Sequence, residues 1–112
     1  MAAQNAKFKN ISKKEIMNTI AEHSLELEQF SVVEIGLFGS FVREDTHPDS
    51  DIDILVKLSN KTFRNYMGLK LFLEDLLGRN IDLVLADAVK PRIKPIVFNE
   101  VEYIVQRFDK LS

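Results

Sequence analysis

The chain has 112 residues, a formal net charge of −2, 46% hydrophobic residues and no cysteine. These values fit one globular domain over residues 1–112, exclude disulfides and thiolate metal sites, and give no overall basic field to attract nucleic acid. Since no apolar run approaches the length of a membrane span and the first residues lack an apolar signal core, we expect a soluble cytoplasmic domain that binds no membrane.

The N-terminal third predicts a helix followed by a strand. Ser12 and Glu15 have the spacing of a capping box, in which each side chain accepts from the backbone of the other. Apolar residues then recur every three or four positions, so residues 12–30 are expected to form one amphipathic helix. Residues 33–38 alternate in the pattern of a strand.

The rest of the chain predicts further strands and helices in alternation. Residues 51–58 give the clearest strand, with apolar side chains on one face and Asp51 and Asp53 on the other. In the helix that follows, Phe63 is assigned to the apolar stripe and Gly78 is expected to end it. The later elements are expected in this order: a helix capped by Ser59 or Asn60 that stops at Gly78, a strand over 80–87, a helix over 92–98 and a strand over 101–106.

This order of elements predicts the fold class. Helices that alternate with strands are typical of an α/β (α+β) domain. We expect a mixed β-sheet of about four strands, with the helices packed mainly on one of its faces. The other face or an edge of the sheet then remains available for a functional site.

Asp51, Asp53 and Asp82 are the candidate metal ligands. The first two are two residues apart on a strand, so their side chains share a face, with Cα atoms about 6.6 Å apart. Asp82 begins a later strand, which could bring it to the same place. Oxygen ligands without histidine or cysteine suit Mg²⁺ or Mn²⁺, and three carboxylates can hold two ions for attack on phosphorus.

Gly39 and Ser40 are the candidate phosphate-binding residues. Glycine lets the backbone approach a ligand closely, and Ser40 can cap a helical turn over residues 41–44 whose amides face a phosphate oxygen. Taken singly, a Gly-Ser pair is most often a plain turn, and an Asp-x-Asp pair is often solvated surface. The order and spacing of the two together favour nucleotidyl transfer.

The stretch from Phe38 to Val56 resembles the minimal nucleotidyltransferase (MNT) branch of the DNA polymerase β-like nucleotidyltransferase superfamily. Gly-Ser, ten residues and then Asp-x-Asp form the signature of that superfamily. The residues that match the fuller MNT pattern are Phe38, Gly39, Ser40, Arg43, Asp45, Ser50, Asp51, Ile52 and Asp53. Glu44 departs from the pattern, because glycine is common there, which bears on the local turn but not on the proposed ligands.

The resemblance implies roles for particular residues. Asp51 and Asp53 would bind Mg²⁺ or Mn²⁺, and Asp82 would complete the metal site or act as the catalytic base. Gly39 and Ser40 would position ATP or another nucleoside triphosphate. Arg43 is expected to pair with Asp45 and brace the loop, and contact of Arg43 with phosphate is the alternative.

The resemblance also implies a biological role. MNT chains of this length resemble antitoxins encoded beside HEPN ribonuclease toxins, some of which transfer AMP to a tyrosine of the toxin. The expected function is therefore that of a protein adenylyltransferase antitoxin with a HEPN partner. Two alternatives stay open: neutralisation of the partner by contact alone, and transfer to a small molecule as in aminoglycoside nucleotidyltransferases.

Overall fold

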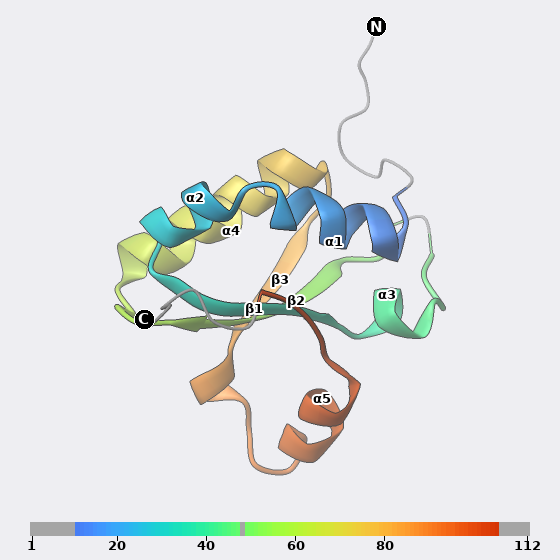
Figure 1. Ribbon diagram of the computed structural model, residues 1–112. Helices are drawn as coiled ribbons and strands as arrows, with labels where there is room; N and C mark the ends of the chain where they lie inside the picture. The colour runs from blue at the N-terminus through green and yellow to red at the C-terminus, as the bar shows by residue number, and fades with distance from the viewer. Residues whose placement is uncertain (1–10, 48, 106–112) are drawn as a thin grey trace, which may run out of the picture.

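The computed structural model of the protein describes residues 11–47 and 49–105 (Figure 1). Helices and strands alternate along the chain as the sequence predicts. The elements are α1 (Lys13–Ala21), α2 (Ser24–Gln29), β1 (Val32–Phe38), α3 (Ser40–Arg43), β2 (Ile52–Leu58), α4 (Phe63–Leu77), β3 (Ile81–Leu85), the 3₁₀ turn η1 (Ala86–Ala88), α5 (Lys94–Glu100) and β4 (Glu102–Val105).

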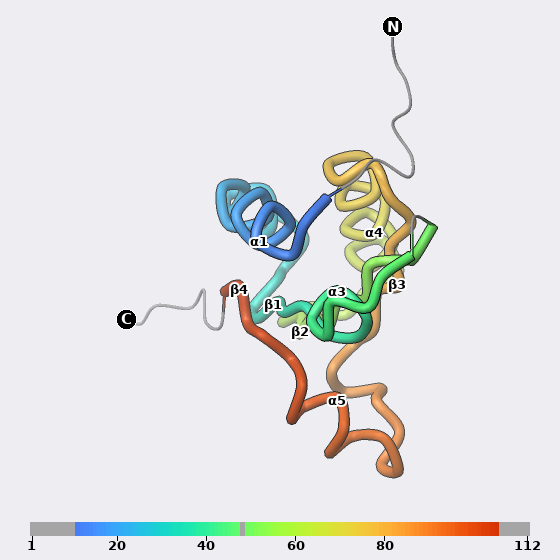
Figure 2. The backbone as a smooth tube through the Cα atoms, turned by 90° about the vertical axis from the view of Figure 1, so that its right-hand side faces the viewer, coloured from blue at the N-terminus to red at the C-terminus, as the bar shows by residue number. Residues whose placement is uncertain are grey.

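The four strands form one mixed sheet in the order β3-β2-β1-β4. β1 is antiparallel to both β2 and β4, whereas β2 and β3 are parallel. Figure 2 shows α1 and α4 above the strands and α5 below them, so most of the helical mass covers one face. The predicted fold class, a mixed sheet of about four strands with helices mainly on one face, is confirmed.

The main core lies between the sheet and helices α1, α2 and α4, which cover its upper face. Ile52, Ile54 and Val56 of β2 are almost fully buried there, which confirms the predicted alternation of that strand. A smaller apolar cluster lies on the opposite face, where Leu55 packs with Val97 of α5. Asp53 points to that same face, because side chains two residues apart on a strand lie on one side.

The predicted N-terminal helix is two helices. The capping box of Ser12 and Glu15 is present, but the helical backbone breaks at His23, whose ψ of 36° is not helical. The Nδ1 atom of this histidine lies 2.7 Å from the carbonyl oxygen of Thr19, and its ring meets Phe72 edge-on. His23 is therefore a packed residue at a bend in the chain.

Helix α4 begins later than predicted and exposes one residue assigned to its apolar stripe. Thr62 caps it by accepting from the Asn65 amide, and Gly78 ends it in the left-handed conformation as expected. Leu69 and Leu73 are fully buried, but the side chain of Phe63 is 79% exposed. Phe63 is in the first turn of the helix, where it borders a pocket with Leu58 and Leu85.

Helix α5 also begins later than the predicted residues 92–98. Pro95 lies in its first turn, where a missing amide hydrogen costs nothing. Strand β4 follows directly, within the predicted range 101–106. Among the described residues, no helix has the length and apolar character needed to cross a bilayer.

The burial of α4 predicts unequal effects of two truncations on the same helix. Leu69→Ala is expected to lower the free energy of unfolding by about 2–5 kcal/mol, because it opens a cavity in the core. Phe63→Ala should change it by less than about 1 kcal/mol, since that ring is mostly in solvent. Urea denaturation of both variants measures the difference, and equal losses would contradict the placement of Phe63.

Candidate active site

The parallel pairing of β2 and β3 brings two of the predicted carboxylates together. Asp53 and Asp82 are direct neighbours in the strand register, so their side chains leave the sheet side by side on one face. Asp51 comes one residue before β2 and acts on Asp53 through its charge. The three predicted ligands therefore gather at one end of the sheet, with Asp51 and Asp82 exposed and Asp53 half-buried.

The surroundings of Asp53 disfavour its ionised form. Burial, the neighbouring charge of Asp82 and a hydrogen bond between the two carboxyl groups raise the pKa of Asp53 from 3.8 to about 6. The charge of Asp51 acts in the same direction, whereas the Ser40 backbone N–H donates to the Asp53 carboxylate and opposes the shift. A hydrogen bond between two carboxyl groups requires a shared proton, and a cation can take the place of that proton.

The turn after β1 is built against Asp53. Gly39 has a φ of 79° and a ψ of −149°, a conformation that residues with a Cβ rarely adopt. A Cβ added to it would lie 2.1 Å from Oδ2 of Asp53. The sequence predicts that this glycine allows close approach to a ligand, and the structure shows that it allows close approach to an aspartate.

The amides of this turn donate to carboxylates of the chain itself. The Gly39 N–H donates to Oε2 of Glu100 at 2.7 Å, and the Ser40 N–H donates to Asp53. Gly39 is the N-cap residue of α3, and Ser40 is its first helical residue, which corrects the expectation that Ser40 caps the turn. Both amides that the sequence predicts would face a phosphate oxygen thus donate to carboxylates of the chain.

Arg43 lies at the end of α3 between two acidic side chains. Its Nε donates to Asp45 at 3.3 Å, so the predicted pair is present, and its Nη1 donates to Oε1 of Glu100 at 2.9 Å. These partners raise the pKa of Arg43. The next residue, Glu44, adopts a left-handed conformation with a φ of 63°, which accounts for the glycine that the related pattern favours there.

Two residues that sequence reasoning missed hold the ends of the strands that carry the aspartates. Arg79 is 2% exposed, lies over the ring of Phe41 in α3, and donates to the carbonyl of Ser50, next to Asp51. Glu74 of α4 accepts from the amide of the first residue of β3 at 3.1 Å. Both contacts link the turn, the carboxylate strands and α4 into one unit.

The carboxylates suit a divalent cation without forming a complete cage for one. In the described part of the chain, no three acidic or histidine side chains converge closely enough to hold a metal by themselves. Asp53 and Asp82 nevertheless touch, and their mutual repulsion is relieved by positive charge between them. Carboxylate oxygens with no sulfur or imidazole are the donors that Mg²⁺ and Mn²⁺ prefer, so the residues fit the predicted metal.

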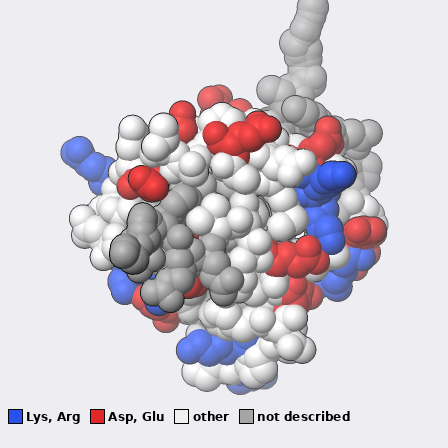
Figure 3. Space-filling model, viewed as in Figure 1, with Lys and Arg blue, Asp and Glu red and all other residues white. Residues whose placement is uncertain are grey.

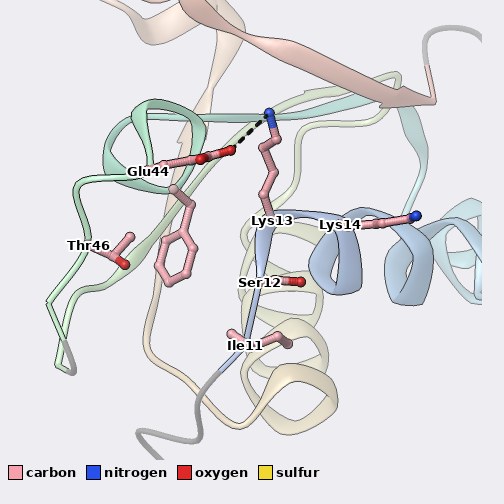
Figure 4. A pocket seen from close by; sticks show the side chains of 7 residues that line it. Ile11, Ser12, Lys13, Lys14, Glu44 and Thr46 are labelled. Carbon is pink, nitrogen blue, oxygen red and sulfur yellow. Dashed lines mark ion pairs between the residues drawn. The ribbon is translucent and has the colours of Figure 1, made fainter.

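A separate cavity of about 360 Å³ lies between the α3 region and the start of α1 (Figure 4). Its wall is made by Ile11, Ser12, Lys13, Lys14, Phe41, Glu44 and Thr46. Lys13 reaches across it toward Glu44, with 3.9 Å between the charged atoms, and also pairs with Glu102 at 3.1 Å. None of the three aspartates lines this cavity.

The exposed loop and first turn over residues 90–96 carry the basic side chains Lys90, Arg92 and Lys94. Figure 3 shows basic side chains at the lower end of the molecule, where α5 lies in Figure 1. The same segment exposes Ile93 and Ile96, which are 48% and 63% accessible.

The sequence pattern of the nucleotidyltransferase domain family (NTP_transf_2) matches residues 18–104. The chain belongs to this family. The matched range includes the turn, both carboxylate strands and α5, so every residue of the candidate site lies within it.

Relatives of similar length carry a more specific name. The protein adenylyltransferase MntA of Thermococcus cleftensis is 40% identical over 96 residues, which cover 84% of this chain and 97% of that protein. A candidate protein adenylyltransferase of Methanocaldococcus jannaschii is 36% identical over 93 residues, which cover 80% of this chain and 95% of its own length.

Solved structures share the fold. A candidate minimal nucleotidyltransferase is 31% identical, has a TM-score of 0.71 and covers 84% of this chain and 97% of its own. A toxin–antitoxin structure with AMP-PNP has a TM-score of 0.62 at 24% identity and covers 79% of this chain and 71% of its own. At that lower identity the likeness shows the fold alone.

The raised pKa of Asp53 predicts that Asp53→Asn stabilises the metal-free protein at pH 7.5. Asparagine keeps an acceptor for the Ser40 amide and can donate to Asp82, so the substitution removes charge repulsion and little else. We expect a gain of about 1 kcal/mol, because solvent screens a half-buried group. Thermal unfolding in the presence of a chelator measures it.

The same measurement across pH provides the control. Between the ordinary value of 3.8 and about 6, the folded wild type holds a proton on Asp53 that the unfolded chain has released. Wild-type stability therefore rises as pH falls from 7.5 through 6, and the advantage of the variant should shrink by pH 5. A constant difference at both pH values would contradict the assigned cause.

Proposed function

We propose that this protein is an Mg²⁺-dependent protein adenylyltransferase that acts as an antitoxin. It transfers AMP from ATP to a tyrosine of a HEPN-domain toxin. The observation that carries the proposal is the register of Asp53 and Asp82, which brings them together next to the Gly39–Ser40 turn. The 40% identical relative that is named a protein adenylyltransferase supports the reaction class.

Asp51, Asp53 and Asp82 would hold the divalent ions. Mg²⁺ held there would supply positive charge against the triphosphate oxygens during in-line attack on the α-phosphorus. The Ser40 hydroxyl and the Arg43 guanidinium lie on the same turn, where they can orient the phosphate oxygens.

The transfer step needs a base and a route for the leaving group. The acceptor hydroxyl oxygen forms a bond to the α-phosphorus, and the bond from that phosphorus to pyrophosphate breaks. Asp82, exposed at the start of β3, receives the proton of the acceptor hydroxyl. Its neighbour Asp53 is less exposed and is tied to the Ser40 amide, so it serves as a fixed ligand.

The proposed partner follows from the fold and from the exposure of the site. One structure with this fold is a complex of an MNT antitoxin with a tri-AMPylated HEPN toxin from Shewanella oneidensis. Because Asp51 and Asp82 are exposed, a protein acceptor can reach them without a second domain of this chain. The exposed basic and apolar segment 90–96 offers further contact area for a partner protein.

Intact-mass spectrometry tests the proposal directly. The HEPN-domain protein of the same organism is incubated with this protein, Mg²⁺ and each nucleoside triphosphate in turn. We expect a mass gain of one or more AMP units with ATP. The gain should fall by at least about 100-fold with the Asp51→Asn/Asp53→Asn double variant, because the metal ligands are lost.

Asp75→Asn, which neutralises an exposed carboxylate on α4, is the matched control and should transfer AMP at the wild-type rate. A mass gain with another nucleotide would correct the base. If no nucleotide adds mass while the double variant still binds the HEPN protein and blocks its ribonuclease activity, the protein neutralises by contact and the transferase proposal is wrong.

A further inference from the structure

One side chain at the C-terminal end of α5 contacts the turn after β1, residues 39–43, which we call the phosphate turn. Glu100 is the last residue of α5, and its carboxylate accepts two hydrogen bonds. Oε2 accepts from the Gly39 amide at 2.7 Å, and Oε1 accepts from Nη1 of Arg43 at 2.9 Å. The contacts join segments 61 and 57 residues apart in the sequence.

We propose that Glu100 is a positioning residue of the nucleotide site, which it serves by fixing Gly39 and Arg43 together. This inference rests on the proposed function and adds a residue to the same site. Glu100 acts through Gly39 and Arg43, each of which is bonded to one of its two carboxylate oxygens. Its side chain is 18% exposed, and its hydrogen bond from the Gly39 amide is partly buried.

The bond to the Gly39 amide matters because this glycine has so little freedom. A Cβ at Gly39 would already overlap Oδ2 of Asp53, and the adjacent Ser40 amide donates to the same carboxylate. Rotation of the peptide before Gly39 would therefore move the turn against a metal ligand. Glu100 accepts from the N–H of that peptide while Asp53 accepts from the next one, so the turn and Asp53 keep one relative placement.

The bond to Arg43 orients a cation that is otherwise half exposed. The side chain of Arg43 is 53% accessible. Without Glu100, its carboxylate partner would be Asp45, which lies 3.3 Å away and is itself 60% exposed. A second, less exposed carboxylate fixes the plane of the guanidinium. One residue of α5 thus sets both the backbone and the cationic side chain of the phosphate turn.

Two substitutions of Glu100 separate these contributions. Glu100→Ala removes both acceptors, whereas Glu100→Gln keeps a neutral acceptor for Gly39 and loses the charge that holds Arg43. Two measurements follow each variant: hydrogen exchange at the Gly39 amide, and titration of Mg²⁺ and AMP-PNP by calorimetry. Neither depends on an acceptor protein.

We expect Glu100→Ala to speed Gly39 exchange and weaken AMP-PNP binding, each about tenfold. Glu100→Gln should keep Gly39 protected and weaken binding about threefold. The matched control is Glu102→Gln on β4, which removes the ion pair of Glu102 with Lys13 of α1. It should change neither the exchange rate nor the AMP-PNP affinity.

Other results would overturn the proposal. Unchanged Gly39 exchange in Glu100→Ala would show that the carboxylate does not fix the turn. Tighter AMP-PNP binding would show that Glu100 occupies a place that phosphate takes. If Glu100→Ala does not fold, Glu100→Gln decides alone: weakened AMP-PNP binding supports the proposal, and wild-type AMP-PNP binding contradicts it.

These outcomes are distinct from failure of the proposed function. Absence of AMP transfer to the HEPN protein would remove the adenylyltransferase proposal while the exchange and binding results still decide the role of Glu100. Normal transfer together with wild-type behaviour of Glu100→Ala would remove only the positioning role.

Discussion

The candidate site depends on one constraint, the packing of Asp53 between another carboxylate and a backbone turn. Parallel pairing of β2 and β3 places Asp82 at its side, and the missing side chain of Gly39 lets the turn close over it. This packing disfavours a negative charge on Asp53 and raises its pKa. A positive charge beside Asp53 would relieve this repulsion, and the remaining contacts of the site fix the geometry around that carboxylate.

The contacts that support this packing come from both faces of the sheet. Arg79 joins the carbonyl of Ser50, beside the carboxylate strand, to the ring of Phe41 in α3, and Glu74 holds the start of β3. From the other face, Glu100 ties α5 to the turn. The small apolar cluster that seats α5 on the sheet is thus also what brings Glu100 within reach of the site. The packing of α5 therefore contributes to the geometry of the site.

The sequence predicts the sheet and its aspartates well because those signals are local. Alternation over residues 51–58 fixes which face each side chain takes, and Asp82 needs only a neighbouring strand to reach Asp53. It does not predict Glu100 or Arg79, whose contacts cross long stretches of chain. The one available signal was weak: Glu100 is the single acidic residue between residues 89 and 101. The exposure of Phe63 and the bend at His23 were missed because packing, not periodicity, decides where a helix ends.

Binding of Mn²⁺ in the presence of AMP-PNP, followed by electron paramagnetic resonance, tests the central claim that Asp51, Asp53 and Asp82 form a nucleotide-linked metal site. The account predicts that Asp53→Asn and Asp82→Asn each weaken Mn²⁺ binding at least about tenfold, whereas Asp75→Asn leaves it unchanged. Equal Mn²⁺ affinity in the wild type and all three variants would show that the carboxylates at this end of the sheet do not hold the metal, and the nucleotidyl-transfer account would fail with them.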